Sequence, residues 1–259
     1  MRPDQRDLLA RVGDLYGCRR DRAEPLRLRV WLLHGRVPFI GYHGLAEMEG
    51  LVQSVAVALA AEGPPSDALG GLTDDVVIPS PIEHMTVGGE PIACCSWGIP
   101  AEGANKQSVY VLRRRPEYDS FNLPRVQTNH GEHKALQVPI STLVTPYLDF
   151  YVRADRERLE ALRPWMHTIG RGGAFSLGAI LQVEIDEDAE DRSLSWRNRP
   201  QRVIPVTTEG PLRVASFVPD TYEMRVQAIR APYWRPWGPH PLCLVPTPQA
   251  LSEALPEAA

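Results

Sequence analysis

The stretch Met166–Ile180, with the sequence MHTIGRGGAFSLGAI, decides the fold because it joins a predicted helix to a predicted strand through a glycine-rich loop. Four glycines fall within the nine residues of Gly170–Gly178. Before the loop, apolar residues recur at spacings of three over residues 155–165, which predicts one buried face of a helix. After it, residues 179–185 are apolar and β-branched and end in an alternating pattern, which predicts a strand.

This order of helix, loop and strand argues against a nucleotide-binding loop. In such loops a strand precedes the glycines and a helix follows them, so that phosphate meets the positive helix N-terminus. Here the loop follows a helix C-terminus, the negative end of the dipole, and no Gly-Lys-Ser/Thr ending is present. Two interpretations remain. The glycines form either a simple helix cap and turn, or a loop whose N–H groups approach another chain's phosphates with Arg171 supplying charge.

Composition and charge restrict the class of protein. The chain has 259 residues, of which 43% are hydrophobic and 23% charged, as in ordinary globular proteins. A net charge of −4 argues against a uniformly basic nucleic-acid-binding protein, and no apolar run approaches the ~20 residues of a membrane span. The four cysteines include no CxxC pair, and no His/Cys spacing typical of a metal site is present. We therefore expect a cytoplasmic protein with reduced cysteines, no metal, no cofactor and no membrane partner.

The charges are unevenly distributed along the C-terminal half. Residues 184–191 contain six acids and no base, and we interpret them as a solvated loop. Residues 192–240 contain eight arginines against three acids. Arginine binds phosphate bidentately and stacks on bases, so this basic segment holds further candidate contacts. They are Arg213, Arg225 and Arg230.

The remaining elements follow from apolar periodicity. The patterns predict a helix within residues 1–24, a strand over 26–34, a helix over 45–61, a hairpin of strands 92–99 and 108–112, and an extended piece over 143–152. Their order is β-α-β-β-α-β with long insertions and a C-terminal extension. This order is typical of an α+β, ferredoxin-like (RRM-like) fold, in which both helices cover one sheet face and the open face can bind RNA. The aromatic signature of the common RNA-recognition module is absent.

Three segments of the chain resemble motifs of one protein superfamily. Residues 129–139 (NHGEHKALQVP) look like its G-x-x-K…P segment, and residues 169–178 (IGRGGAFSLG) look like its glycine loop. Residues 231–246, with APYWR and CLVP, look like its terminal R-P-P-Y-W…C-V-V-P element. In this order the motifs resemble the RAMP superfamily of CRISPR-associated proteins. Within it, they resemble the type IV effector subunit that occupies the "five" position. Two departures are Gly172-Gly173 in place of a second basic residue and Gly44-Leu45-Ala46 in place of a Leu-Asp helix start.

The resemblance implies a non-catalytic subunit that grips the 5′ handle of a CRISPR guide RNA and caps the filament of backbone RAMP subunits. It also implies a large subunit as a partner, with target DNA nearby. The predicted organisation is an N-terminal helical extension over 1–24, a RAMP domain over 25–190 and a basic C-terminal segment over 191–259 packed on the core.

Candidate RNA contacts fall in four groups. Lys134 is either a phosphate contact or a solvated lysine. Tyr233 and Trp234 either stack on a splayed base or staple the C-terminal segment to the core. At most two of the three consecutive arginines 113–115 can face RNA. The assigned residues are Lys134; Gly170, Arg171, Gly172, Gly173 and Gly178; Arg113, Arg114 and Arg115; and Tyr233, Trp234 and Arg235.

The alternative function is a metal-independent endoribonuclease that processes precursor CRISPR RNA. Such an enzyme needs a general base, a general acid and a cation beside the scissile phosphate. His43, His133 and Lys134, with His130 in the same loop, are the residue types that could supply them. No Ser-His-Asp order or paired carboxylate motif is evident, so we expect binding without turnover.

Overall fold

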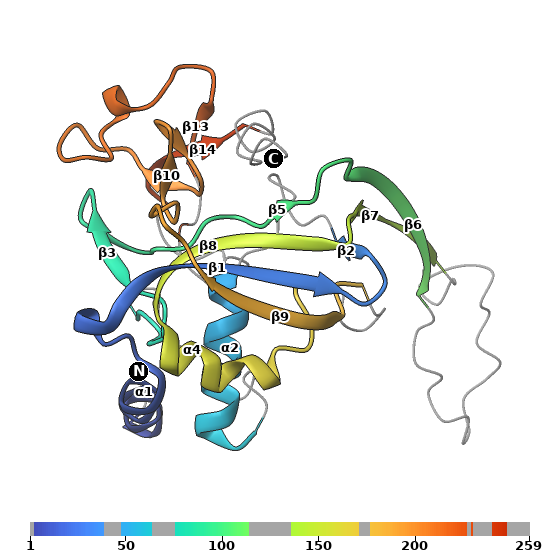
Figure 1. Cartoon of the computed structure of the whole chain (residues 1–259), viewed down its shortest axis with the longest axis horizontal. Helices are drawn as coiled ribbons and strands as arrows, with labels where there is room; N and C mark the ends of the chain where they lie inside the picture. Colours follow the sequence, from blue (N-terminus) through green and yellow to red (C-terminus); the bar gives the residue numbers. More distant parts are fainter. Residues whose placement is uncertain are drawn as a thin grey trace, which may run out of the picture.

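The computed structural model describes residues 3–38, 48–63, 76–113, 136–170, 177–226, 229 and 240–247. It is an α+β structure, as predicted from the sequence, and it has several antiparallel sheets and few helices. Figure 1 shows the helices on one side of a central sheet and a group of short C-terminal strands on the other.

The central sheet has four strands in the order β5-β8-β1-β9, and all neighbours are antiparallel. Strand β1 (Ala23–Leu32) lies between β8 (Tyr147–Asp155) and β9 (Ile180–Glu187), and the short β5 (Ile99–Pro100) pairs with β8. Alternate β1 residues, from Leu26 to Leu32, are buried on one face. This period of two places the core on that face and polar residues on the other.

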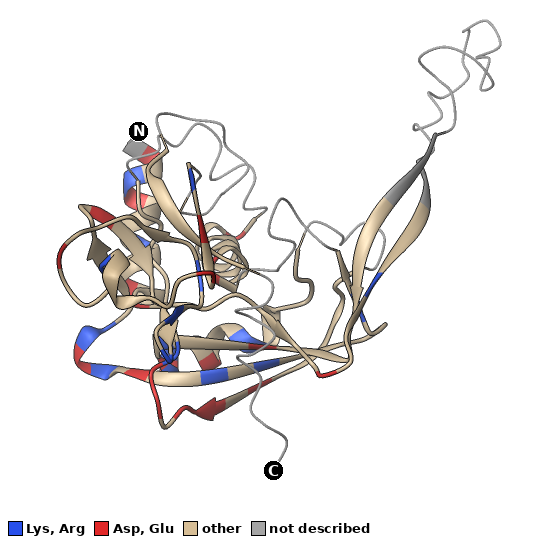
Figure 2. Cartoon of the chain, turned by 90° about the horizontal axis from the view of Figure 1, so that it is seen from above, with Lys and Arg blue, Asp and Glu red and all other residues tan. Residues whose placement is uncertain are grey.

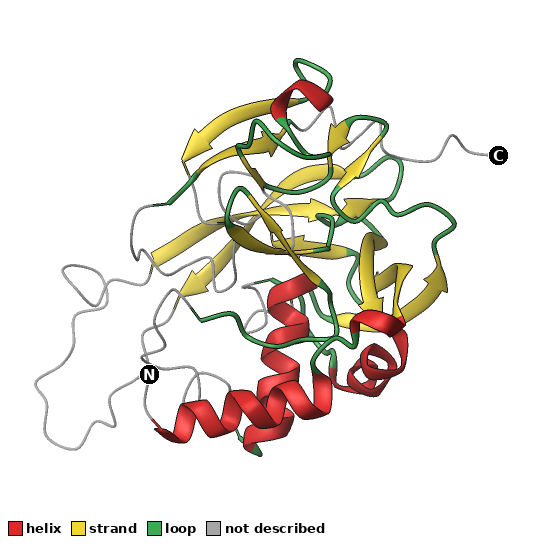
Figure 3. Ribbon diagram, turned by 90° about the vertical axis from the view of Figure 1, so that its left-hand side faces the viewer, coloured by secondary structure: helices red, strands yellow, loops and turns green. Residues whose placement is uncertain are grey.

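In the described part of the chain, three helices cover the buried face, as Figure 3 shows. They are α1 (Pro3–Tyr16), α2 (Met48–Ala61) and α4 (Arg156–Leu162), and they share one hydrophobic cluster with the sheet. Asp155 caps α4 by accepting a hydrogen bond from the Arg158 N–H at 3.3 Å. The 3-10 helix η3 (Arg163–Trp165) then leads into the glycine-rich segment, and another 3-10 turn, η1 (Arg20–Arg22), precedes β1. The predicted helix, loop and strand order is confirmed at both ends of the glycine loop.

A second hydrophobic cluster lies beyond the other face of the sheet. It joins the hairpin of β3 (His84–Val87) and β4 (Glu90–Ala93) to residues 194–245. We call the described residues 193–247 the C-terminal module. Its elements are β10 (Ser195–Trp196), β11 (Arg199–Pro200), β12 (Ile204–Pro205), the 3-10 turn η5 (Val214–Ser216), β13 (Tyr222–Val226) and β14 (Leu242–Pro246).

The longest hairpin projects from the sheet. Strands β6 (Asn105–Arg113) and β7 (Leu136–Val144) pair over nine residues each, and β2 (Arg36–Pro38) pairs with the base of β7. Figures 1 and 2 show this hairpin extending away from the body of the molecule at the end of the sheet where β1 finishes.

The predicted hairpin between residues 92–99 and 108–112 is wrong. Strand β4 ends at Ala93 and pairs with β3, whereas β6 pairs with β7. The extended piece over 143–152 is likewise two strands, β7 and β8, in different sheets. Thr145 marks the corner between them, since its hydroxyl accepts from the Ala101 N–H at 3.0 Å and donates to the Tyr147 carbonyl at 2.7 Å. Periodicity identified extended segments here but carried no information about their partners.

The acidic run 184–191 is not a solvated loop. Its first residues belong to β9, and Asp186 accepts a hydrogen bond from Arg27 at 2.5 Å. Asp188 is buried and is ion-paired with Arg192. The run therefore neutralises arginines of the sheet and Arg192, which directly precedes the C-terminal module.

Within the described residues, no helix combines the length and the apolar character needed to span a bilayer.

Candidate nucleic-acid interface

The glycine-rich loop begins and ends at a closed base, which we call the glycine-loop stem (residues 167–170 and 177–180). Two backbone hydrogen bonds of 2.8 Å join its sides: the Ile169 N–H donates to the Gly178 carbonyl, and the Ile180 N–H donates to the His167 carbonyl. The stem fixes where the loop leaves and re-enters the fold.

Gly178 is required by the geometry of this stem. Its φ of +74° lies in the left-handed region, and a Cβ at this position would sit 2.0 Å from the Ile169 carbonyl oxygen. Any side chain would therefore force the two sides apart. Gly170, on the opposite side, also has a positive φ of +79°. These two predicted glycines therefore lie in the stem, one on each side of the loop.

Strand β2 connects the stem to the projecting hairpin. The Gly178 N–H donates to the Arg36 carbonyl at 2.9 Å, and Arg36 pairs with Val144 of β7. The Arg36 side chain continues across the hairpin, where Nη2 donates to Gln107 Oε1 of β6 at 3.5 Å. The stem, β2 and the hairpin base therefore meet at one end of the central sheet, which we call the loop end.

Arg36 differs electrostatically from the arginines along the sheet. Arg29 makes two hydrogen bonds of 2.8 Å to Asp149, and Arg27 is bound by Asp186. Among the described residues, Arg36 makes no ion pair. Strands β6 and β7 carry Lys106 and Arg113 and no acid, and Figure 2 shows no Asp or Glu colouring along their described ribbon. The loop end therefore holds an arginine, Arg36, that no carboxylate of the described residues neutralises, which suits contact with phosphate.

Most of the predicted contacts lie outside the described residues. Arg113 ends β6, and its backbone pairs with Leu136 at the start of β7. The chain between them leaves and returns at this one pair, so the predictions at Arg114, Arg115 and Lys134 belong to a single segment, 114–135. The other predictions outside the described residues are Arg171, Gly172, Gly173, Arg230, Tyr233, Trp234 and Arg235, and the alternative catalytic residues His43, His130 and His133.

Two weaker predictions lie elsewhere. Arg225, in β13, is ion-paired with Glu223. Arg213 is exposed just before η5. Both belong to the C-terminal module, so the structure does not bring them to the loop end.

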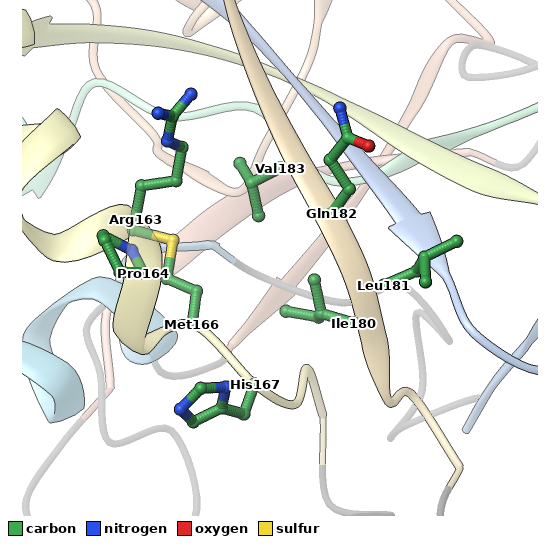
Figure 4. A pocket seen from close by; sticks show the side chains of 8 residues that line it. All are labelled: Arg163, Pro164, Met166, His167, Ile180, Leu181, Gln182 and Val183. Carbon is green, nitrogen blue, oxygen red and sulfur yellow. The ribbon is translucent and has the colours of Figure 1, made fainter.

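A pocket of about 380 Å³ lies beside the stem, between η3 and the first half of β9 (Figure 4). Ile180 and Val183 point into it from the strand, and Arg163 and His167 supply basic groups. Leu181 is the extra residue of a β-bulge, because Ile180 pairs with Leu32 whereas Gln182 pairs with Trp31. Bulges of this kind turn a side chain out of the regular alternation, and Leu181 is 64% exposed. The full lining is Arg163, Pro164, Met166, His167, Ile180, Leu181, Gln182 and Val183.

Sequence reasoning missed Arg36, Arg163 and His167. For Arg163 and His167, the adjacency to the glycine loop was an available signal. For Arg36 there was none, because its importance depends on hydrogen bonds to two segments far along the chain.

The cysteines do not form a reactive or metal-binding site within the described residues. None of the four forms a disulfide, and Cys94, Cys95 and Cys243 are buried. Burial raises the pKa of Cys94 to about 12, which keeps it protonated and inert at neutral pH. In the described part of the chain, no group of three or more His, Cys, Asp or Glu residues could hold a metal ion.

The fold and the loop end define a class of protein. It is an α+β protein whose antiparallel sheet carries helices on one face and has the glycine-loop stem and a projecting hairpin at one end. The family model of CRISPR type IV associated protein Csf3 matches residues 102–241, more than half of the chain, and the chain belongs to this family. The match includes the β6–β7 hairpin and the glycine-loop stem. A search of curated proteins found no match. The predicted type IV CRISPR assignment is confirmed.

Proposed function

We propose that this chain is the non-catalytic RNA-binding subunit of a type IV CRISPR ribonucleoprotein. In this proposal it grips the 5′ handle of the guide RNA at the loop end and caps the filament of backbone subunits, with a large subunit and target DNA nearby. The observation that carries the proposal is the convergence at the loop end. There the stem closed by Gly178, Arg36, which no described carboxylate neutralises, and strands β6 and β7, which carry no acid, meet within one hydrogen-bonded unit.

The sheet topology supports a ferredoxin-like RAMP fold. Strand β5 is antiparallel to β8, and β8 is antiparallel to β1, so β1 and β5 run parallel with β8 between them. With α2 after β1 and α4 after β8, the strands β1, β5, β8 and β9 give the β-α-β-β-α-β order. The remaining strands before β9, which are β2, β3, β4, β6 and β7, are then insertions into that unit.

The two hydrophobic clusters support the proposed organisation of the chain. One cluster joins the central sheet to α2 and α4, and α1 packs against it with Val12 fully buried. The other holds the C-terminal module and the β3–β4 hairpin together. We assign residues 25–190 to the RAMP domain, 1–24 to an N-terminal extension and 191–259 to a segment packed on that domain.

The charge distribution suits local rather than uniform contact with RNA. A net charge of −4 gives little general attraction to a polyanion, so affinity must come from a few placed donors. Arg36 and main-chain N–H groups of the glycine loop are such donors, since they bind phosphate oxygens without reading sequence. Sequence recognition of DNA then falls to base pairing with the guide.

The proposal is tested by fluorescence anisotropy with the full chain and a 5′-labelled, 20-nucleotide single-stranded RNA in EDTA. We expect saturable binding that weakens with salt and an RNA that stays intact on a denaturing gel. Absence of saturable binding at low salt would overturn the RNA-binding proposal. Multiple-turnover cleavage in EDTA would instead support the endoribonuclease.

A further inference from the structure

Two aromatic side chains lie opposite each other on the sheet face that points away from the helices. Trp31 of β1 pairs with Tyr147 of β8, and their ring centroids are 5.1 Å apart with an interplanar angle of 64°. Both rings are half-buried, and neither belongs to a hydrophobic cluster of the described residues. Burial in a core therefore does not account for this pair.

The pair is held from one side by an arginine. The Arg29 guanidinium lies 4.0 Å from the centroid of the Tyr147 ring, and Asp149 fixes that guanidinium through two hydrogen bonds of 2.8 Å. Tyr147 in turn meets Trp31 edge to face. The indole is thus positioned by a chain of contacts that begins at a carboxylate, which lowers the entropy lost when a ligand stacks on it.

The contacts around the pair favour a base over a phosphate. We call Trp31, Tyr147 and Arg29 the aromatic patch. Asp149 offsets the charge of Arg29, so this patch lacks the free cation that a phosphate needs. On the other side of Trp31, its β9 partner is the exposed Gln182, whose amide nitrogen donates to Glu184 Oε1 at 3.2 Å and whose second N–H and carbonyl oxygen can still donate and accept hydrogen bonds. An aromatic ring beside an amide is suited to the face and edge of a nucleobase.

The patch also adjoins the loop end. The Leu33 N–H donates to the Ala179 carbonyl of the glycine-loop stem at 2.9 Å, two residues after Trp31. Arg36 follows three residues later, with its carbonyl bound to Gly178. Towards the other end of β8 the same face is covered, because Tyr151 is buried against Arg192, 3.9 Å from its ring centroid, and packs with Trp196. The loop end is thus where this face offers both an aromatic surface and a nearby phosphate contact.

We propose that Trp31 stacks on a base of single-stranded RNA, with Tyr147 and Arg29 as positioning residues and Gln182 at the base edge. This inference rests on the proposed RNA binding and adds a base-stacking site to its phosphate contacts. Because every base has a π-face, the site tolerates different sequences.

The first test is photo-cross-linking with the full chain. The probes are 12-nucleotide single-stranded RNAs, each with 4-thiouridine at one position, and cross-linked peptides are mapped by mass spectrometry. We expect one nucleotide position to cross-link to the end of β1 or the start of β8. Cross-links confined to the C-terminal module or to the helices would overturn the proposal, even if RNA binds.

The second test measures RNA affinity of matched tryptophan variants by anisotropy. We expect Trp31→Ala to lose about tenfold in affinity and Trp31→Phe, which keeps a ring, to recover most of it. Trp165→Ala, at a 54% exposed tryptophan in η3, is the control and should match the wild type.

The outcomes separate this inference from the function on which it rests. If the wild type binds RNA and Trp31→Ala binds within twofold of it, the stacking site is wrong and the proposed function stands. If the wild type binds no RNA, both fall. If Trp31→Ala does not fold, the cross-links of the wild type decide.

Discussion

Arg202 and Arg36 show two uses of arginine in one chain. Arg202, in the C-terminal module, is buried 3.6 Å from Glu49 of α2, and it donates to the backbone carbonyl of Ile229 at 3.1 Å. The side chain of Arg36, at the loop end, makes one hydrogen bond among the described residues, to the neutral amide of Gln107. Arg202 links the C-terminal module to helix α2, whereas no carboxylate of the described residues offsets the charge of Arg36. The density of arginines along the sequence therefore says less about RNA contact than the presence of a carboxylate beside each one.

The largest effect is expected at the buried pair. Arg202→Met leaves Glu49 buried without its guanidinium partner, which should destabilise the protein by about 3–5 kcal/mol. RNA affinity of the remaining folded protein should be unchanged. Chemical denaturation and anisotropy measure the two quantities, and Arg213→Met, at an exposed arginine of the same module, is the control. A loss of RNA affinity without a loss of stability would reverse the roles assigned to the two regions.

Gly178→Ala should damage the loop end directly. The added Cβ meets the Ile169 carbonyl oxygen and the backbone must hold a positive φ, so we expect a destabilisation of about 2–4 kcal/mol and at least a tenfold loss of RNA affinity. Gly103→Ala is the matched control, because its φ is +77° but no atom lies within 4 Å of the new Cβ. Equal effects of the two variants would show that backbone strain, rather than the stem, is responsible.

Removing the charge of Arg36 should change binding more than stability. Arg36→Gln keeps a polar side chain and the backbone pairing, so the melting temperature should stay near that of the wild type. RNA affinity should fall about fivefold, and the slope of log affinity against log salt should decrease by about 0.7, the value for one phosphate contact on a single strand. Arg27→Gln, which removes an arginine already bound by Asp186, should leave the slope unaltered. An unchanged slope in Arg36→Gln would exclude a phosphate contact there.

The smallest effect is expected in how the stability contributed by the Arg19–Asp155 ion pair depends on pH. The Arg19 guanidinium is hydrogen-bonded to Asp155 and holds the pKa of that carboxyl below its ordinary value. A lowered folded-state pKa gives stability that is present above the unfolded pKa, near 3.9, and is lost as the pH falls through the lower folded value. Arg19→Gln should therefore be less stable than the wild type at pH 7, and the difference should vanish towards pH 2. Denaturation curves between these values measure it, and a difference that grows in acid would contradict the assignment. Arg22→Gln, at an exposed arginine bound to Glu157, is the control.

Sequence patterns predicted the elements that depend on local order. The helix before the glycine loop could be predicted because Leu159 and Leu162 recur at a helical spacing. The strand after the loop could be predicted because apolar and polar residues alternate around Val183. The partner of β6 could not be predicted, because 22 residues separate β6 from β7. The alternating pattern of a strand is also the same whichever strand it pairs with. The acids of β9 were misread for a similar reason, since their pairing with Arg27 depends on strand register.

Within the described residues, the parts of the candidate site that were predicted are Gly170, Gly178 and Arg113. Gly170 and Gly178 carry a signal in their spacing, and the structure explains both by positive φ. Arg36 and Trp31 carry none, because an arginine or a tryptophan in a strand looks the same whether or not a carboxylate or a core covers it. Their assignment required the register of β1 with β8 and β9 and of β2 with β7.

The central claim is that RNA contacts the loop end and leaves the C-terminal module free. Hydrogen–deuterium exchange of the full chain, with and without a saturating 20-nucleotide single-stranded RNA, tests it without any substitution. We predict slower exchange at residues 31–38, 140–147 and 177–182 and unchanged exchange at residues 193–205 on addition of RNA. Protection confined to the C-terminal module, with the loop end unaffected, would contradict the account.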